Sequence, residues 1–186
     1  FMMRNIAPKE IVGNPFAMIG DQWMLITAGD GENCNTMTAS WGGLGVLWNA
    51  PVATCYVRPQ RYTKQFLDEQ EYFTLTFFPE KYRKELTVCG TKSGRDMDKV
   101  KECGFTVKTA ACGAPYFEEA ELVIVCRKRY VQDFDPAAIP ADVKEKQYPN
   151  ADFSSIFAAL PERHIAGAII ITASLSRERI TLDCPS

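Results

Sequence analysis

The chain has 186 residues, a formal net charge of −2 and a pI near 5.5, and 46% of its residues are hydrophobic while 24% are charged. This length predicts a single domain over residues 1–186, and the composition is ordinary for a globular protein. The charge balance does not favour a nucleic-acid-binding surface, and no apolar run is as long as a transmembrane span. We therefore expect neither a nucleic acid nor a membrane as a partner.

The cysteines indicate a reducing environment. There are seven of them, an odd number, and none belongs to a C-x-x-C pair. In a chain of this length, that pattern favours reduced thiols in the cytoplasm over a disulfide scaffold. A zinc or iron–sulfur site usually shows closer pairing, so we expect no metal site.

The first part of the chain predicts a β-hairpin and one further strand. Trp23–Ala28 is rich in strand-forming residues, Gly29–Asn33 is typical of a turn, and Cys34–Ser40 fits the returning strand. The hairpin is expected to end at Trp41–Gly43. Pro51–Val57 then has the composition of another strand.

The middle of the chain predicts two helices around one strand. The apolar spacing of Thr63–Glu69 predicts a short helix, and the aromatic and β-branched segment Tyr72–Phe78 predicts a strand. Pro79–Cys89 is typical of a helix that begins at a proline and stops at Gly90.

A short helix through Lys99 and Cys103 is predicted next, with Ser93 or Asp96 as its cap. Ala120–Arg127 is a long apolar run bounded by polar residues, which predicts a strand.

The last part of the chain predicts an irregular insertion between strands. Asp133–Pro161 contains four prolines and little periodicity, so we expect an excursion that covers a site or meets a partner. Gly167–Ser174 predicts a buried strand, and Arg179–Leu182 a final one. Many short strands with few helices favour a mainly β, antiparallel barrel with helical insertions over a Rossmann fold.

The run Asn35–Trp41 (Asn-Thr-Met-Thr-Ala-Ser-Trp) has two interpretations. It is a strand with hydroxyl groups on one face, or it is a cradle for a flat cofactor ring. In the second interpretation, small residues let the backbone approach the ring, and Thr38 and Ser40 add hydroxyl donors. Trp41 can then pack against the ring or form a wall at its edge.

The run Arg58–Thr63 (Arg-Pro-Gln-Arg-Tyr-Thr) also has two interpretations. It is a solvated loop whose threonine caps a helix, or it is a phosphate site. In the second interpretation, the Thr63 hydroxyl donates a hydrogen bond to the phosphate, and the amides at the helix N-terminus favour its negative charge. An arginine then forms paired hydrogen bonds with the phosphate oxygens.

A third run, Cys89–Lys99, makes the pattern specific. Its sequence is Cys-Gly-Thr-Lys-Ser-Gly-Arg-Asp-Met-Asp-Lys, and alone it is typical of a loop and a capped helix. In this order, the three runs resemble the flavin reductase-like family, in its flavoredoxin-like branch. The resemblance covers about residues 14–126. It implies an FMN-binding split β-barrel with a Greek-key-like antiparallel arrangement.

The resemblance also implies which residues contact FMN. The Arg61-Tyr62-Thr63 element matches the phosphate end, and Lys99 matches a flavin contact. His164 is the only histidine, and we first interpret it as a structural histidine; the resemblance also matches it to a histidine near the flavin in the family. The full set of implied contacts is Asn35, Thr38, Ala39, Ser40, Trp41, Arg61, Tyr62, Thr63, Ser93, Arg95, Lys99 and His164.

The function implied by the resemblance is redox chemistry through bound FMN, with no catalytic side chain. The chain would be an NAD(P)H:flavin reductase or a flavoredoxin-like electron carrier, acting as a homodimer. Its electron donor would be a nicotinamide or a redox protein. Two alternatives stay open: a non-catalytic module that binds FMN or another cofactor, and a pyridoxamine phosphate oxidase-like enzyme on the related barrel.

Overall fold

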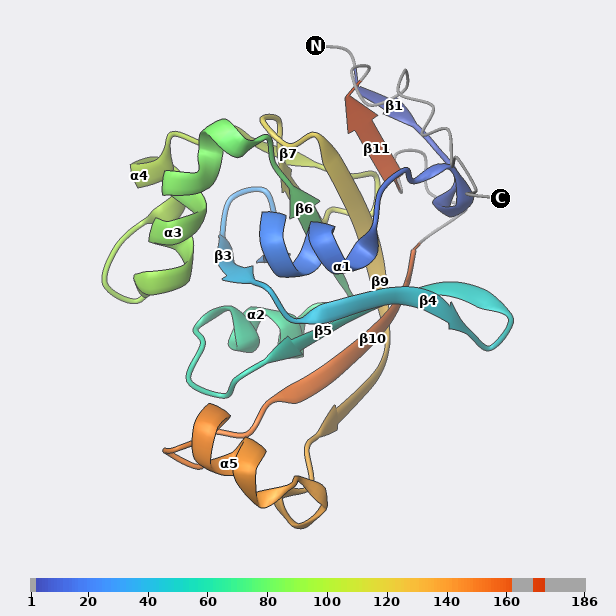
Figure 1. Cartoon of the computed structure of the whole chain (residues 1–186). Coiled ribbons are helices and arrows are strands. Elements are labelled where there is room, and N and C mark those ends of the chain that lie inside the picture. Colours follow the sequence, from blue (N-terminus) through green and yellow to red (C-terminus); the bar gives the residue numbers. More distant parts are fainter. Residues whose placement is uncertain (1–2, 162–168, 173–186) are drawn as a thin grey trace, which may run out of the picture.

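The computed structural model describes residues 3–161 and 169–172, and within these ranges nine strands form one antiparallel sheet (Figure 1). Seven of the strands follow the order β3-β2-β6-β9-β10-β5-β4, and β11 pairs with both β9 and β1. The strands are β1 (Met3–Asn5), β2 (Met24–Gly29), β3 (Cys34–Ala39), β4 (Gly42–Leu47), β5 (Ala50–Val57), β6 (Tyr72–Phe77), β9 (Leu122–Asp133), β10 (Ser155–Pro161) and β11 (Ile169–Thr172).

The two end strands of this order, β3 and β4, are consecutive in sequence but are not paired in the described part of the chain. The sheet therefore curls into a barrel that stays open between them. This confirms the predicted fold class, a mainly β split barrel with helical insertions.

The long strand β9 organises the sheet because it has partners on both edges. One edge pairs with β6 along Leu122–Arg127. The other edge pairs first with β11 along Leu122–Ile124 and then with β10 along Cys126–Asp133. A register shift in the β9–β10 pair, at Ala158 and Ala159, marks a β-bulge, which bends the strand and increases its twist.

Short helices and a small second sheet cover the barrel. In Figure 1, α3 and α4 lie together on one side, while α5 lies at the far end of β9 and β10. No helix in the described ranges is both long and apolar enough to cross a membrane. The remaining elements are η1 (Pro8–Glu10), α1 (Pro15–Ala17), η2 (Met18–Gln22), α2 (Thr63–Glu69), η3 (Glu80–Tyr82), α3 (Arg83–Thr91), α4 (Lys99–Cys103), β7 (Val107–Thr109), β8 (Pro115–Phe117), η4 (Pro136–Ala138) and α5 (Ala141–Gln147).

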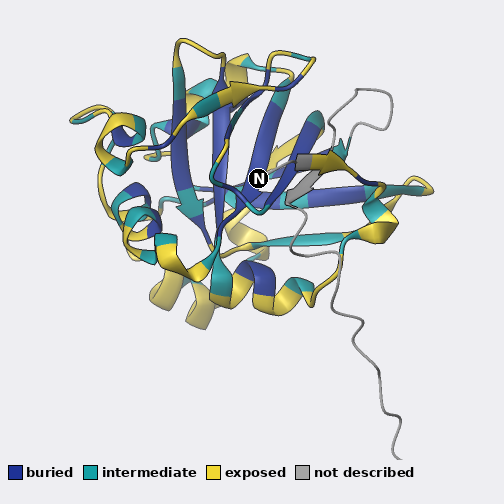
Figure 2. Cartoon of the chain, turned by 90° about the horizontal axis from the view of Figure 1, so that it is seen from above, coloured by how far each residue is buried: buried dark blue, intermediate teal, exposed yellow. Residues whose placement is uncertain are grey.

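Two hydrophobic clusters share the central strands. Because side chains alternate across a strand, Leu122, Ile124 and Cys126 of β9 enter the barrel cluster. Val123 and Val125 enter the second cluster, beneath α3, α4 and the β7–β8 sheet. Burial on both faces explains why this part of β9 is a continuous apolar run. Figure 2 shows the result, with buried strands inside and helices exposed on their outer faces.

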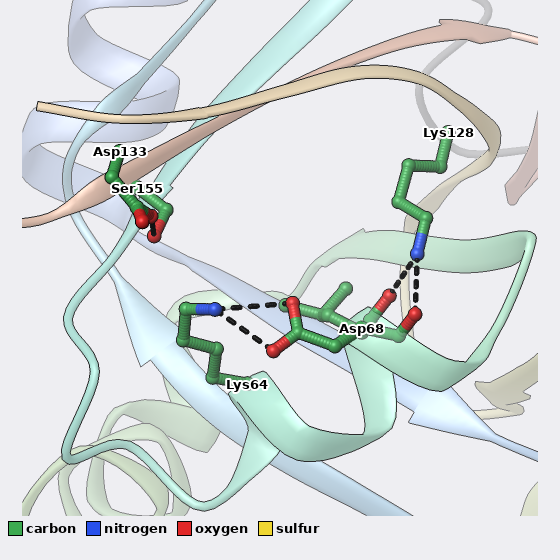
Figure 3. Close-up of polar contacts among 6 residues, drawn as sticks. Lys64, Asp68, Lys128, Asp133 and Ser155 are labelled. Carbon is green, nitrogen blue, oxygen red and sulfur yellow. Dashed lines mark hydrogen bonds and ion pairs between the residues drawn. The ribbon is translucent and has the colours of Figure 1, made fainter.

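Helix α2 is fixed to the sheet through its C-terminal end (Figure 3). The Lys128 ammonium on β9 donates to the backbone carbonyls of Leu67 and Asp68, at 2.5 and 2.9 Å. A cation at a helix C-terminus satisfies free carbonyls and complements the helix dipole. Lys64 forms an ion pair with the Asp68 carboxylate at 2.8 Å within the same helix. The Lys128 contacts attach the C-terminal end of α2 to β9.

Several predicted elements are confirmed with small shifts. The strands predicted at 23–28, 34–40, 51–57, 72–78 and 120–127 correspond to β2, β3, β5, β6 and β9, and the helix predicted over Thr63–Glu69 is α2. Gly90 does not end the next helix, since α3 continues to Thr91. Helix α4 is capped by Asp98, not by Ser93 or Asp96, because the Asp98 carboxylate accepts the Lys101 amide at 3.1 Å.

The irregular segment predicted over Asp133–Pro161 is only partly irregular. It contains α5 and, at its end, β10, which lies between β9 and β5 in the sheet. The Ser155 hydroxyl donates to the Asp133 carboxylate at 2.5 Å and closes the start of this strand pair (Figure 3). The prolines occupy the connection and the strand end, which concealed the strand between them.

Three other predictions differ from the structure or extend beyond the described residues. Gly42–Gly43, expected to close a hairpin, instead begins the edge strand β4, which pairs with β5. Of the strand predicted over 167–174, residues 169–172 form β11. The strand predicted over Arg179–Leu182 lies outside the described residues.

Phe157→Ala tests the central position of β10. The Phe157 side chain is fully buried in the barrel cluster, so the change should reduce the free energy of unfolding by about 3–5 kcal/mol in chemical denaturation. Ile156→Ala, on the opposite face of the same strand and half-buried, is the matched control and should cost less than half as much. A cost for Phe157→Ala below about 1 kcal/mol would contradict the assignment of β10.

Candidate functional site

A cavity of about 180 Å³ lies between the end of β3, the end of β5 and the C-terminal turn of α3. The Thr38 hydroxyl on β3 donates to the Leu86 carbonyl and ties the strand to α3. Gly90 permits this close approach, because a Cβ there would lie 3.2 Å from the Thr38 side chain. The lining residues are Met37, Thr38, Ala39, Ser40, Trp41, Tyr56, Arg58, Arg61 and Gly90.

Two arginines make this cavity positive. Arg61 donates to the Gly90 carbonyl at 2.7 Å, and no carboxylate of the described residues forms an ion pair with it. Burial lowers the pKa of the Arg61 guanidinium, and the nearby charge of Arg58 lowers it further. Arg58 does have a carboxylate partner, Asp152, at 3.0 Å. Two guanidinium groups that repel each other in one cavity favour an anionic ligand between them.

Arg58 also connects the cavity to the segment that follows α5. Its guanidinium carbon lies 5.4 Å from the Trp41 ring centroid and 5.1 Å from that of Tyr148. These are cation–π distances. The guanidinium donates to the Gln147 carbonyl at 2.6 Å, and the buried Tyr148 hydroxyl pairs with that of Ser154 at 3.1 Å. The predicted excursion therefore meets the rim of the site.

A larger cavity, of about 410 Å³, lies beside Asn35, Tyr62 and Lys99 and is lined by groups of both charges. Two carboxylates, of Glu32 and Asp98, and one ammonium, of Lys99, line it, so its lining is not positive overall. The remaining lining residues are Gly31, Asn33, Cys34, Asn35, Tyr62, Phe66, Gly94, Met97, Val100 and Val107.

Lys99 is a buried cation with only 4% of its surface exposed. Its ammonium donates to the Thr36 carbonyl on β3 and to the Cys89 carbonyl on α3, both at 2.9 Å. Burial, followed by the charge of Arg61, lowers the pKa of Lys99 to about 8. Lys99 therefore joins the strand to the helix that frames the smaller cavity.

The sequence-predicted residues separate into three groups. Thr38, Ala39, Ser40, Trp41 and Arg61 line the smaller cavity, and Asn35, Tyr62 and Lys99 line the larger one. Thr63, Ser93 and Arg95 line neither of these two cavities. His164 lies outside the described residues.

The residues of the third group have structural contacts. The Thr63 hydroxyl is fully buried and accepts the Asn35 side-chain amide at 2.7 Å. The Ser93 hydroxyl accepts the Arg95 amide at 3.2 Å. Arg95 stacks over the Tyr62 ring at 4.7 Å and donates to a backbone carbonyl. The contacts of Ser93 and Arg95 order the loop between α3 and α4, while the Thr63 contact joins α2 to β3.

Met37, Tyr56, Arg58 and Gly90 also line the smaller cavity but are not among the flavin contacts that the resemblance implies, although all except Tyr56 lie within the three runs. For two of them a signal was present. Tyr56 lies in β5 and Arg58 directly follows its last residue, Val57, so continued strand alternation places the two side chains on one face. Gly90 could be identified only from the contact between α3 and β3 in the structure.

Lys99→Met should remove the two hydrogen bonds while keeping most of the side-chain volume. We expect the free energy of unfolding to fall by about 1–3 kcal/mol at pH 7, because two buried carbonyls lose their donor. The folded-state pKa of about 8 lies below the ordinary value of 10.5, so the unfolded chain binds more protons between these values. Wild-type stability should therefore rise from pH 8 to pH 10 relative to the variant.

Urea unfolding of both proteins across this pH range measures that difference. If the difference in free energy of unfolding between wild type and Lys99→Met stays constant or becomes smaller as the pH rises, a lowered Lys99 pKa is contradicted.

Comparison with solved structures identifies split-barrel relatives. A flavoredoxin from Methanosarcina acetivorans superposes with a TM-score of 0.63 at 22% identity, covering 82% of this chain and 69% of that one. An FMN-binding protein from Thermus thermophilus gives 0.65 at 17% identity, covering 94% and 85%. An FMN-binding domain of a flavin reductases-like enzyme from Shewanella baltica OS155 gives 0.63 at 15% identity, covering 91% and 77%. A comparison with curated proteins gives no match.

These structural likenesses establish the fold. The family is given by the sequence itself, because residues 17–142 match the family model described as "Flavin reductase like domain". That match spans more than half of the chain and includes all three runs that carry the resemblance. The chain therefore belongs to the flavin reductase-like domain family, and its broad function is flavin-related redox chemistry.

Proposed function

We propose that this protein binds FMN in the 180 Å³ cavity beside Thr38–Trp41 and works as an oxidoreductase through it. Family membership supports a flavin, and relatives described as FMN-binding support FMN in particular. The observation that carries the choice of cavity is its charge. Arg58 and Arg61 line it, and no carboxylate of the described residues does.

The charge of the lining distinguishes the two cavities. FMN carries a phosphate, and arginine binds phosphate through paired hydrogen bonds. In the larger cavity, Glu32 and Asp98 would repel that phosphate, and Lys99 already donates to two backbone carbonyls. In the smaller cavity, Arg61 has no described carboxylate partner and can accept an anion.

The other lining residues fit a flat ring. Thr38, Ala39 and Ser40 are small, so a ring can lie close to the backbone of β3. Trp41 offers an aromatic surface at the rim and is held there by Arg58. Ligand cavities usually measure about 300–1,000 Å³, so this one encloses only part of a flavin nucleotide and leaves the rest accessible. An accessible flavin suits exchange of electrons with a second molecule.

When bound, FMN supplies hydride and single-electron transfer, which no side chain can perform. The tasks left to the chain are binding, orientation and charge stabilisation. Arg58 and Arg61 hold and stabilise negative charge, while the hydroxyls of Thr38 and Ser40 are available for hydrogen bonds that orient the ring. Lys99 acts indirectly, since it fixes β3 against α3.

FMN titration of the purified protein, followed by flavin fluorescence, tests this assignment. Arg61→Ala should raise the Kd for FMN by about 10- to 100-fold, because a charge-assisted hydrogen bond is lost. Arg129→Ala removes the same type of charge at an exposed position of β9 and should leave the Kd unchanged. Equal Kd values for wild type and Arg61→Ala would refute the assignment of this cavity.

The same preparation, loaded with FMN and kept free of oxygen, distinguishes reductase from carrier. Bleaching of the flavin spectrum by NADH or NADPH supports an NAD(P)H-dependent flavin reductase. A spectrum that neither nicotinamide alters, but that a reduced redox protein bleaches, supports a flavoredoxin-like electron carrier. A protein that binds no FMN would contradict both forms of the proposal.

A homodimer is also part of the proposal. The β4–β5 hairpin extends from the body of the protein (Figure 1) and carries exposed apolar residues, with Val46 77% and Trp48 59% exposed. Apolar surface of this kind is typical of a protein interface. Light scattering at micromolar concentration should give twice the chain mass, and Val46→Glu should shift it towards the monomer. Val143→Glu, on α5, is the control, and a monomeric wild type would contradict the dimer.

A further inference from the structure

Two cysteines that are distant in sequence meet beside the proposed flavin cavity. The sulfur atoms of Cys89, on α3, and Cys103, the last residue of α4, lie 3.8 Å apart. Neither is part of a disulfide in the structure. The two cysteines are fourteen residues apart in the sequence, so no short sequence motif indicates the pair. Contact between the two sulfurs places them close to bonding geometry.

The two thiols differ in access. Cys89 is completely buried in the second hydrophobic cluster, while Cys103 packs against that cluster and is partly exposed. A dissolved oxidant therefore reaches Cys103 first. Cys89 is then the nearest thiol that can attack the modified Cys103 sulfur.

The elements joined by this contact also form the site. Gly90, directly after Cys89, lines the smaller cavity and accepts the hydrogen bond from Arg61. Lys99, one turn before Cys103, donates to the Cys89 carbonyl. A covalent bond between the two sulfurs would thus hold together the helices that carry both contacts.

We propose that Cys89 and Cys103 form a reversible disulfide, with a low-molecular-weight disulfide such as oxidised glutathione as the oxidant. The Cys103 thiolate attacks one glutathione sulfur, which breaks the glutathione S–S bond and releases one reduced glutathione. Cys89 then loses its proton and attacks the Cys103 sulfur, which forms the protein disulfide and releases the second glutathione. Two protein thiols are oxidised and one glutathione disulfide is reduced to two thiols, so atoms and electrons balance.

Burial sets the pH dependence of this exchange. It raises the pKa of both thiols, and for Cys89 the neighbouring Cys103 raises it further. Exchange proceeds through the thiolate, so its rate should increase as the pH rises from 7 to 9. For Cys103, the hydrogen bond with Cys89 and the charge of Lys99 lower the pKa, while the charges of Glu85 and Glu102 raise it.

The disulfide should slow the release of flavin, an effect that rests on the proposed function. The sulfurs must approach from 3.8 Å to about 2.05 Å, which draws α4 against α3. The closed segment includes the loop with Ser93 and Arg95 and the Lys99 side chain. Its restriction reduces the local opening that a ligand needs in order to leave.

Peptide mapping of the full-length protein tests the bond itself. The reduced protein is incubated with oxidised glutathione at pH 8, alkylated and digested with trypsin without reduction. We expect a link between peptides 85–92 and 102–108 that dithiothreitol removes. Cys89→Ser should stop at a glutathione adduct on Cys103, and Cys34→Ser, which alters another partly exposed thiol, should keep the link. Absence of the link in the wild type would overturn the proposal.

Stopped-flow measurement of FMN release tests the consequence. Release should be several-fold slower from the oxidised than from the reduced wild type, and equal in Cys103→Ser with and without oxidised glutathione. Equal rates from both wild-type forms would overturn the effect on flavin. If neither form binds FMN, the proposed function fails, while peptide mapping still decides whether the disulfide forms.

Discussion

The site depends on one buried cation, Lys99, which bridges a strand and a helix. Its ammonium donates to the Thr36 carbonyl of β3 and the Cys89 carbonyl of α3. Both hydrogen bonds are buried, so each carbonyl needs a donor within the protein, and the long Lys99 side chain from α4 reaches both. The bridge keeps α3 against β3, and the smaller cavity exists at the end of that contact. Burial disfavours the charged form of the ammonium, and this lowers the pKa of Lys99.

The distribution of charge around this bridge gives the cavities different chemistry. Arg61 faces the smaller cavity and Lys99 faces the larger one, where two carboxylates offset it. A split barrel alone does not determine what is bound, because function is located in the site and not in the fold. In this chain, Arg58 and Arg61 lie next to small residues of β3. This combination indicates where a flavin expected from family membership would bind.

Strands whose own composition favours β-structure could be predicted from the sequence. Strands that form mainly because neighbouring strands pair with them could not. Tyr72–Phe77 is aromatic and β-branched, so it forms a strand from local preference. Gly42–Leu47 has weak strand preference and becomes β4 only because β5 pairs with it. Ser155–Pro161 was concealed by neighbouring prolines and becomes β10 because β5 and β9 lie on both sides of it. Tertiary pairing is information that a local pattern does not contain.

The same distinction applies to the site. Thr38–Trp41 could be selected from sequence because the run is contiguous, and the structure places it on one cavity. Gly90 enters the same cavity from α3, so only the packing of α3 against β3 reveals it, whereas Arg58 lies in the run that predicted a phosphate site. The resemblance groups Lys99 with the flavin contacts, and in the structure its ammonium donates to two backbone carbonyls. Asp98, which caps α4, was overlooked because two neighbouring residues offered equally good local caps.

A crystal structure of the protein grown with FMN is the most direct test of the central claim. The account predicts flavin density in the cavity lined by Thr38–Trp41, with the phosphate bound by Arg58 or Arg61. Flavin in the 410 Å³ cavity beside Glu32 and Asp98 would contradict it, because the charge argument would then have selected the wrong site.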